Sequence, residues 1–149
     1  MRPNVNEQLE GMCRILENAI APELNNGYTL ETLRSLVANV RMLGRAWHQL
    51  LPFLHWDNAA MLDLLREARG SADAARQARI DEALDTPPAD ATDALSAESR
   101  NDALRALLCD CLDGPTALTA LTARIAAHLS ERSRRYPLRL TGAVPKHKS

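Results

Sequence analysis

Apolar residues recur every three or four positions over most of the chain, which is the spacing of one face of an α-helix. The first stripe runs from Leu9 to Leu24 and ends where Pro22 removes a backbone donor, ahead of the loop residues Asn25-Asn26-Gly27. A second stripe begins after Thr29, a predicted N-cap, and contains Leu33, Leu36, Val37, Val40, Leu43, Trp47, Leu50, Leu51 and Leu54. We expect this second helix to be the centre of the core, with Leu36, Val40, Leu43 and Trp47 all buried.

Pro52 lies near the end of the second stripe, and a proline inside a helix predicts a kink or a break. Asp57 is then the predicted N-cap of a third helix, with Trp56 and Met61 at the two positions of a hydrophobic staple. The third helix is expected to continue to Ala68 and to loosen at Gly70-Ser71.

The second half of the chain repeats the helical spacing in shorter segments. An alanine-rich stretch over 72–84 precedes a loop at 85–95, where the tandem prolines Pro87-Pro88 exclude a helix interior. Ser96 is the predicted cap of the next helix, and Asp113-Gly114-Pro115 separates that helix from the last one. The apolar stripes of these two helices are Leu104, Leu107, Leu108, Cys111 and Leu112, then Leu118, Leu121, Thr122, Ile125 and Leu129.

The sequence lacks the alternation of apolar and polar residues that is typical of strands. The helical spacing of apolar residues therefore predicts an all-α fold. We expect an antiparallel helical bundle of four main helices with one or two short extra helices and an irregular C-terminal tail. The bundle is predicted to be a single domain over residues 1–135, and residues 136–149 form a basic tail.

Composition narrows the class of protein. In 149 residues, 46% are hydrophobic, and no apolar run approaches the ~18 residues of a membrane span. The first residues lack the apolar region of a secretory signal, and three cysteines, an odd number, favour reduced thiols in a cytoplasm. We therefore expect a cytoplasmic protein without a membrane partner.

Charge is divided unevenly along the chain. Residues 1–131 hold 12 cations and 19 acids, a net charge of −7, whereas residues 132–149 hold six cations and no acid. The favoured interpretation is a basic arm that docks on its own acidic body or is solvated; the alternative is an arm that reaches a partner. We do not expect nucleic acid as a partner, because the body is acidic and the arm has almost no aromatic residues.

Polar residues flank the second apolar stripe. Arg34, Arg41, Arg45 and His48 share one side of the predicted helix, and Glu7, Glu10 and Glu17 recur at similar spacing in the first helix. In an antiparallel hairpin these stripes form surface ion pairs; alternatively the arginines form an anion site. Asn39 borders the stripe, and we expect a half-buried amide there, bonded to a neighbour or directed into a small cavity. The candidate ligand-binding residues are Asn39, Arg41, Arg45, His48 and His55.

The segment 47–58 contains three of the five aromatic residues, and large aromatic side chains often anchor interfaces. Trp47, Phe53 and Trp56 are therefore the interface candidates.

His48, His55 and Asp57 have the residue types of a two-histidine, one-carboxylate metal site. Pro52 interrupts the regular helix that this site needs, so we predict no metal and no cofactor. Cys109 and Cys111 point in opposite directions on a helix, with Cys111 toward the core, and no glycine-rich phosphate loop or nucleophile elbow occurs.

The N-terminal motifs Arg2-Pro3, Leu9-Glu10, Ile20-Ala21-Pro22-Glu23-Leu24 and Val37-Ala38-Asn39-Val40 carry a family resemblance. The chain up to about Leu50 resembles a family of small bacterial all-helical proteins of unknown function, encoded near acyl-CoA dehydrogenases and aminoglycoside-phosphotransferase-like kinases. The resemblance implies a bacterial accessory protein of such enzymes and assigns no catalytic residue.

Two functions follow as expectations. The first is a non-catalytic accessory or interaction protein, with a second copy or a partner enzyme as its partner. The alternative is a small-molecule-binding helical bundle, with lyase- or isomerase-like activity, that uses a polar cavity near Asn39 and His48.

Overall fold

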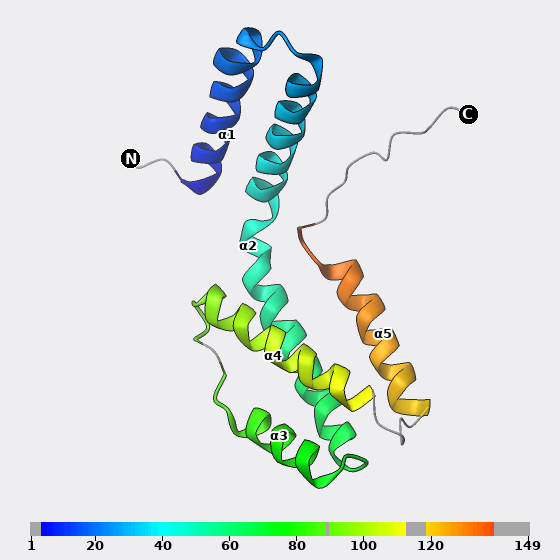
Figure 1. The fold of residues 1–149 in the computed structure, drawn as a ribbon. Coiled ribbons are helices and arrows are strands. Elements are labelled where there is room, and N and C mark those ends of the chain that lie inside the picture. The colour runs from blue at the N-terminus through cyan, green and yellow to red at the C-terminus, as the bar shows by residue number, and fades with distance from the viewer. Residues whose placement is uncertain (1–3, 89, 113–118, 139–149) are drawn as a thin grey trace, which may run out of the picture. The chain divides into compact units, whose positions relative to one another are not determined.

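The computed structural model describes residues 4–88, 90–112 and 119–138, and these residues form helices without any strand (Figure 1). The predicted all-α class is confirmed. The elements in order are α1 (Val5–Ile15), the π-helical η1 (Leu16–Ile20), the 3₁₀ turn η2 (Ala21–Glu23), α2 (Gly27–Arg69), α3 (Ala74–Asp85), α4 (Ala94–Leu112) and α5 (Thr119–Arg135).

The first helix begins and ends for local reasons. Asn4 and Glu7 form a capping box, in which each side chain accepts from the other residue's backbone N–H. The helix widens into η1 and tightens into η2 where Pro22, as predicted, removes a backbone donor. The next helix is capped by Asn26, whose Oδ1 accepts from the N–H groups of Tyr28 and Thr29, and not by Thr29 as expected.

Of the kink or break predicted at Pro52, the break does not occur, because α2 is one helix of 43 residues that includes this proline. A proline in a helix interior costs about 3 kcal/mol. Phe53 and Leu54 next to it are almost fully buried, and burying such side chains contributes about 1.5–3 kcal/mol each, which offsets the cost. Asp57 is therefore not an N-cap but a mid-helix residue, and no staple forms between Trp56 and Met61.

The chain divides into two compact units within α2. The N-terminal unit contains α1, η1, η2 and α2 up to His48, and the C-terminal unit spans Gln49–Tyr136. Pro52 has no N–H to donate to the carbonyl of His48, so the division falls at the turn of α2 that lacks a hydrogen bond. The single domain over 1–135 stays a prediction.

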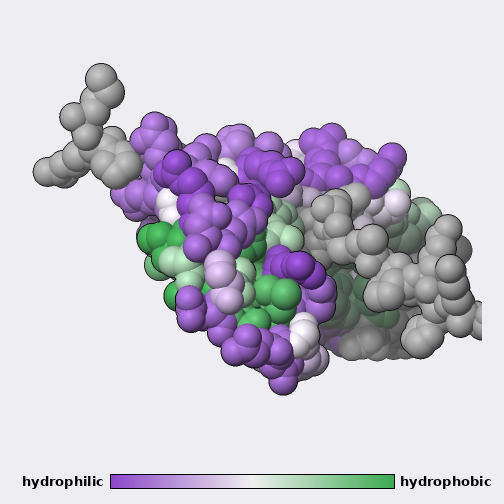
Figure 2. Space-filling view, turned by 90° about the horizontal axis from the view of Figure 1, so that it is seen from above, coloured by the Kyte–Doolittle hydropathy of each residue, from purple (hydrophilic) through white to green (hydrophobic). Residues whose placement is uncertain are grey.

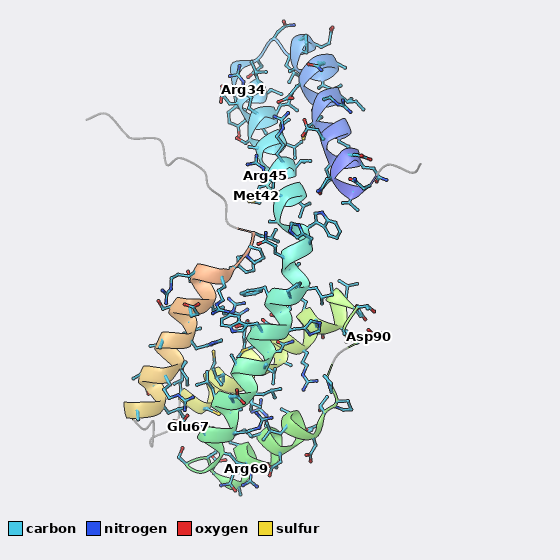
Figure 3. The ribbon with its side chains drawn as sticks, turned by 180° about the vertical axis from the view of Figure 1, so that it is seen from behind. Arg34, Met42, Arg45, Glu67, Arg69 and Asp90 are labelled. Carbon is cyan, nitrogen blue, oxygen red and sulfur yellow. The ribbon has the colours of Figure 1, made fainter. Side chains whose placement is uncertain are left out.

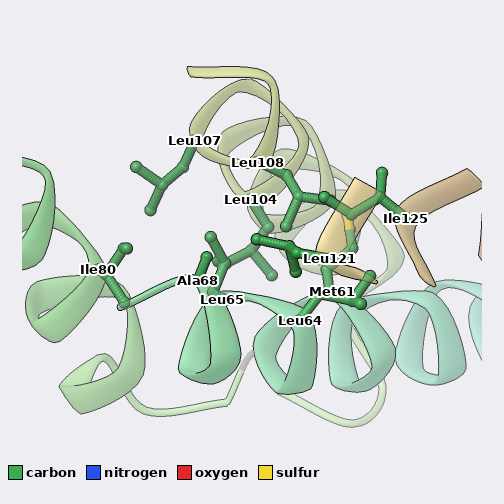
Figure 4. Packing of buried hydrophobic residues seen from close by; sticks show 10 residues of the cluster. All are labelled: Met61, Leu64, Leu65, Ala68, Ile80, Leu104, Leu107, Leu108, Leu121 and Ile125. Atoms are coloured by element: carbon green, nitrogen blue, oxygen red, sulfur yellow. The ribbon is translucent and has the colours of Figure 1, made fainter. Parts of the chain in front are cut away.

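The C-terminal unit holds the main core. Four helices contribute to it: α2 with Met61, Leu64, Leu65 and Ala68, α3 with Ile80, α4 with Leu104, Leu107 and Leu108, and α5 with Leu121 and Ile125 (Figure 4). The stripe predicted for α4 is confirmed, with Cys111 and Leu112 partly buried against this core. Asp93, and not Ser96, caps α4, because its Oδ1 accepts from the N–H groups of Leu95 and Ser96. The predicted break at 113–115 and Leu118 lie outside the described residues.

The N-terminal unit buries far less than expected. Val37 is buried beside Cys13, whose Sγ lies 3.8 Å from the Val37 carbonyl oxygen. The prediction that Leu36, Val40, Leu43 and Trp47 are all buried is wrong: Leu36 is 48% exposed, Leu43 and Trp47 are each 42% exposed, and Val40 is half-buried. Helix α1 covers only the side of α2 that faces it, so the flank of the predicted stripe remains at the surface.

Candidate functional site

Arg41 is the predicted site residue with the most contacts. Its guanidinium lies between two carboxylates of the preceding helices, with Nη1 2.7 Å from Glu17 Oε1 and Nη2 3.2 Å from Glu10 Oε1. The hydrogen bond from Arg41 lowers the pKa of Glu10, and the bonds to Glu17 and Glu10 raise the pKa of Arg41. These are the ion pairs that the antiparallel hairpin predicted. The guanidinium that an anion site would need is already hydrogen-bonded to both carboxylates.

The other predicted ligand-binding residues of the N-terminal unit are at the surface. Asn39 is exposed and not half-buried, because it lies on the side of α2 away from α1. His48 is also exposed, edge-on to the Trp47 ring at 6.2 Å between centroids. An open groove of about 470 Å³ between α1 and α2 is lined by Arg41 and Arg45, together with Asn6, Leu9, Glu10, Val40 and Gly44, and includes neither Asn39 nor His48.

The two-histidine, one-carboxylate arrangement does not occur among the described residues, where no group of three His, Cys, Asp or Glu side chains could hold a metal ion. The Nε2 atom of His55 lies 3.2 Å from the carbonyl oxygen of Ala91, in the loop before α4.

Asp57 is the centre of a polar cluster that the sequence did not predict. Its side chain is completely buried, and Oδ2 accepts from Asn101 Nδ2 at 2.7 Å and from Arg132 Nε at 2.8 Å. Asn101 also donates to Asn58 Oδ1, and Asn58 in turn donates to the carbonyl oxygen of Ala97. One carboxylate thus ties α2, α4 and α5 together, which is the arrangement that a buried charge requires.

His128 completes this cluster from α5. Its Nε2 lies 3.0 Å from Asp57 Oδ1, but the pair misses the angles of a hydrogen bond, and neither atom has another hydrogen-bond partner among the described residues. Trp56 covers the imidazole with its ring at 5.5 Å, and the Arg135 guanidinium lies 4.4 Å from the Trp56 ring centroid. Both polar atoms are sealed from solvent, so the cluster holds helices together and offers no surface to a substrate.

Two of the three interface candidates are used inside the C-terminal unit. Phe53 is buried, with the Tyr136 ring edge-on at 5.3 Å, and Trp56 is half-buried between Phe53 and His128. Trp47 alone has a large exposed area, although its Nε1 donates to Asn6 Oδ1 at 2.9 Å.

The basic arm begins inside α5. Arg132 bonds to Asp57, while Arg134 and Arg135 pair with Glu131, so these three cations dock on acidic residues of their own unit, which was the favoured interpretation. The remaining cations of the predicted tail, Arg139, Lys146 and Lys148, lie outside the described residues.

Sequence reasoning missed Asp57 because Pro52 suggested a new helix. Because α2 is unbroken, Asp57 falls in the same three-and-four series as the apolar residues Leu50, Leu54, Met61 and Leu64. An acidic residue at a position that the spacing assigns to the core could have indicated a buried polar cluster. Its partners Asn101 and Arg132 lie 44 and 75 residues further along the chain and gave no local sign of it.

Exposed apolar residues concentrate in the N-terminal unit. Of the eleven large apolar side chains that the described residues expose, eight belong to it: Val5, Met12, Ile15, Ile20, Tyr28, Leu36, Leu43 and Trp47. Apolar surface also appears between hydrophilic residues in the space-filling view of Figure 2. A monomeric protein seldom leaves so many large apolar residues together, so this surface is a candidate interaction site.

Helical geometry sorts the residues of this hairpin onto two faces, since each residue is about 100° from the next. We call the first the uncharged face: Val5, Gln8, Met12 and Ile15 on α1, Ala19 on the π-helical η1, and Thr29, Thr32, Leu36, Asn39, Leu43 and Trp47 on α2. The charged residues of α1, η1 and α2 up to His48 lie on the other side, namely Glu7, Glu10, Glu17, Glu31, Arg34, Arg41 and Arg45, except that Arg14 borders the face in an open groove that Met12 and Ile15 also line. Arg34 and Arg45 project from this part of α2 in Figure 3.

Comparison of the chain with protein-family models, with curated proteins and with solved structures found no match. None of the helices that the structure describes combines the length and the apolar character needed to cross a membrane.

Proposed function

We propose that the chain is a non-catalytic interaction protein that binds its partner through the uncharged face of the N-terminal hairpin. The observation that supports this is the separation of apolar and charged residues onto opposite sides of a two-helix hairpin, with Leu36, Leu43 and Trp47 exposed. Interfaces are depleted of charge at their centre and enriched in aromatic residues and methionine, and this face has both properties.

The polar cluster supports the non-catalytic part of the proposal. Asp57 is fully buried and already bonded to Asn101 and Arg132, so its carboxylate has a structural task that leaves no room for a reacting group. The proposal keeps the predicted antiparallel helical bundle and places the protein in a bacterial cytoplasm, as the N-terminal resemblance and the odd cysteine count favour. The partner is then a second copy or an enzyme of the kind that the resemblance implies.

Site-specific photo-crosslinking in the native cell tests this function. Benzoylphenylalanine in place of Leu43 should give one dominant cross-linked product, because Leu43 is central on the uncharged face. The same probe in place of Arg34, on the charged side of the same helix, is the matched control and should give little product. Equal cross-linking at both positions, or none at either, would show that the uncharged face is not a binding surface.

A further inference from the structure

We infer that the partner at the uncharged face is a second copy of this chain, and that the two hairpins pack face to face as an intermolecular four-helix bundle. This inference rests on the proposed function and names its partner. A two-helix hairpin buries only the stripes along which its helices meet, whereas stable helical domains pack at least two layers around one core. Among the described residues, Met12, Ile15, Leu36 and Leu43 are exposed side chains that such a second layer would cover.

Charge favours a second copy over a different partner. A two-fold axis brings the same patch of both subunits together, so any charged residue near the axis meets a like charge. The uncharged face contains no ionisable side chain and has Arg14 at its border, whereas the opposite side carries seven charged residues. The uncharged face can therefore pair with itself without repulsion, and it offers no charge to attract an acidic or a basic partner.

Residue spacing on both helices fits bundle packing. The positions Val5, Gln8, Met12, Ile15 and Ala19 follow intervals of three and four, and so do Thr29, Thr32, Leu36, Asn39 and Leu43. These intervals define the seam of left-handed helical bundles. Asn39 fits the same seam, because an amide both donates and accepts and can bond to its own counterpart across a two-fold axis.

The size of the face sets the expected affinity. The helical segment from Val5 to Glu23 spans roughly 28 Å at 1.5 Å per residue, and two helices are roughly 20 Å wide, so each copy presents roughly 550 Å². Two copies bury about 1,100 Å², near the lower limit of specific interfaces. We therefore expect a reversible dimer of micromolar affinity and not a permanent one.

Sedimentation equilibrium of the full chain, from low micromolar to near-millimolar concentration, tests the inference. The wild type should move from monomer to dimer over this range. Leu43→Glu should weaken association by about a hundredfold or more, because it places like charges together in the seam. Ala38→Glu adds the same charge to the same helix on its exposed, charged side, near Arg34 and Arg41, and should dimerise like the wild type.

Circular dichroism must show that each variant keeps its helical content. If Leu43→Glu unfolds, Ile15→Glu replaces it, since Ile15 lies on the same face of the other helix and is highly exposed. A wild type that stays monomeric throughout, or a dimer that both glutamate variants on the face leave intact, overturns the inference. If the chain is monomeric but position 43 still cross-links to a different protein, the inference that the partner is a second copy is wrong. The proposed function, binding through the uncharged face, would then still hold.

Discussion

Helix α2 carries the same three-and-four spacing of apolar residues through both units, yet the two halves bury it differently. In the C-terminal unit Met61 and Leu65 are at most 1% exposed, whereas Leu36, Leu43 and Trp47 in the N-terminal unit keep close to half of their surface. Spacing therefore identifies the apolar face of a helix and does not determine whether that face is covered.

The number of neighbouring helices explains the difference. The stripe of the C-terminal unit meets residues from α3, α4 and α5, which together form one cluster around it. Within the described residues of its own unit, the N-terminal stripe meets α1 and its π-helical continuation, through contacts such as Cys13 with Val37 and Arg41 with Glu17. A pair of helices buries only one side of each apolar stripe, whereas a group of four helices buries the whole stripe.

The largest expected effect is a matched truncation in the two halves of α2. Leu65→Ala should lower the free energy of unfolding by about 2–5 kcal/mol, because it opens a cavity in a fully packed core. Leu36→Ala removes the same atoms from a half-exposed position and should cost below about 1 kcal/mol in the monomer. Urea unfolding followed by circular dichroism at low protein concentration measures both.

Equal losses for the two variants would contradict the comparison, because they would mean that the flank of the N-terminal stripe is covered within one chain. Val37→Ala serves as an internal reference for this measurement. It lies in the same unit but faces α1 and is buried, so its cost should exceed that of Leu36→Ala.

The next effect contrasts the buried and exposed acids of α2. Asp57→Ala leaves Asn101 and Arg132 without their acceptor in the interior, and breaking such a pair costs about 3–5 kcal/mol. Because 22% of the Arg132 side chain is exposed and can recover hydration, we expect about 3 kcal/mol. The same unfolding experiment applies.

Asp63→Ala is the control, since this acid lies on the same helix and pairs with Arg66 at the surface. Exposed pairs contribute about 0–1 kcal/mol, so the control should unfold almost like the wild type. If Asp57→Ala were as harmless as Asp63→Ala, the polar cluster would not join α2 to α5.

The same two regions show which features a sequence can predict. The helices around 5–15, 74–85, 94–112 and 119–135 follow from periodicity, because this signal is local, whereas the cap predicted for 94–112 was three residues away from the observed one. The continuity of α2 through Pro52 was missed, since it depends on burial of Phe53 and Leu54 against α4, and such contacts are not encoded locally.

The candidate surface was predicted only in part. Trp47 was named an interface candidate from its aromatic character, but it was also assigned to the core, together with Leu36 and Leu43, because all three share the spacing of truly buried residues. Within the described part of the N-terminal unit only one helical segment packs on α2, and the number of neighbours is not revealed by a short stretch of sequence. Asn39 was placed at the border of the stripe correctly and was expected to be more buried than it is.

The smallest effects are differences in thiol reactivity, which report on each unit separately. Burial raises the pKa of Cys13 in the N-terminal unit and of Cys111 in the C-terminal unit, and the thiolate is the reactive form. Cys109 is exposed on α4. With a water-soluble disulfide reagent at neutral pH, Cys109 should react first, Cys111 later, and Cys13 at least about tenfold more slowly than Cys109.

Urea below the main unfolding transition then distinguishes the two units. Cys13 can react only when α1 separates from α2, and the hairpin is held by less buried apolar surface than the C-terminal core, so its local opening should require less free energy. Mild urea should therefore accelerate labelling of Cys13 more than labelling of Cys111, as followed by mass spectrometry of the cysteine peptides. Equal acceleration of both thiols would mean that the units open together, as one cooperative domain over residues 1–135 would, in spite of their unequal burial.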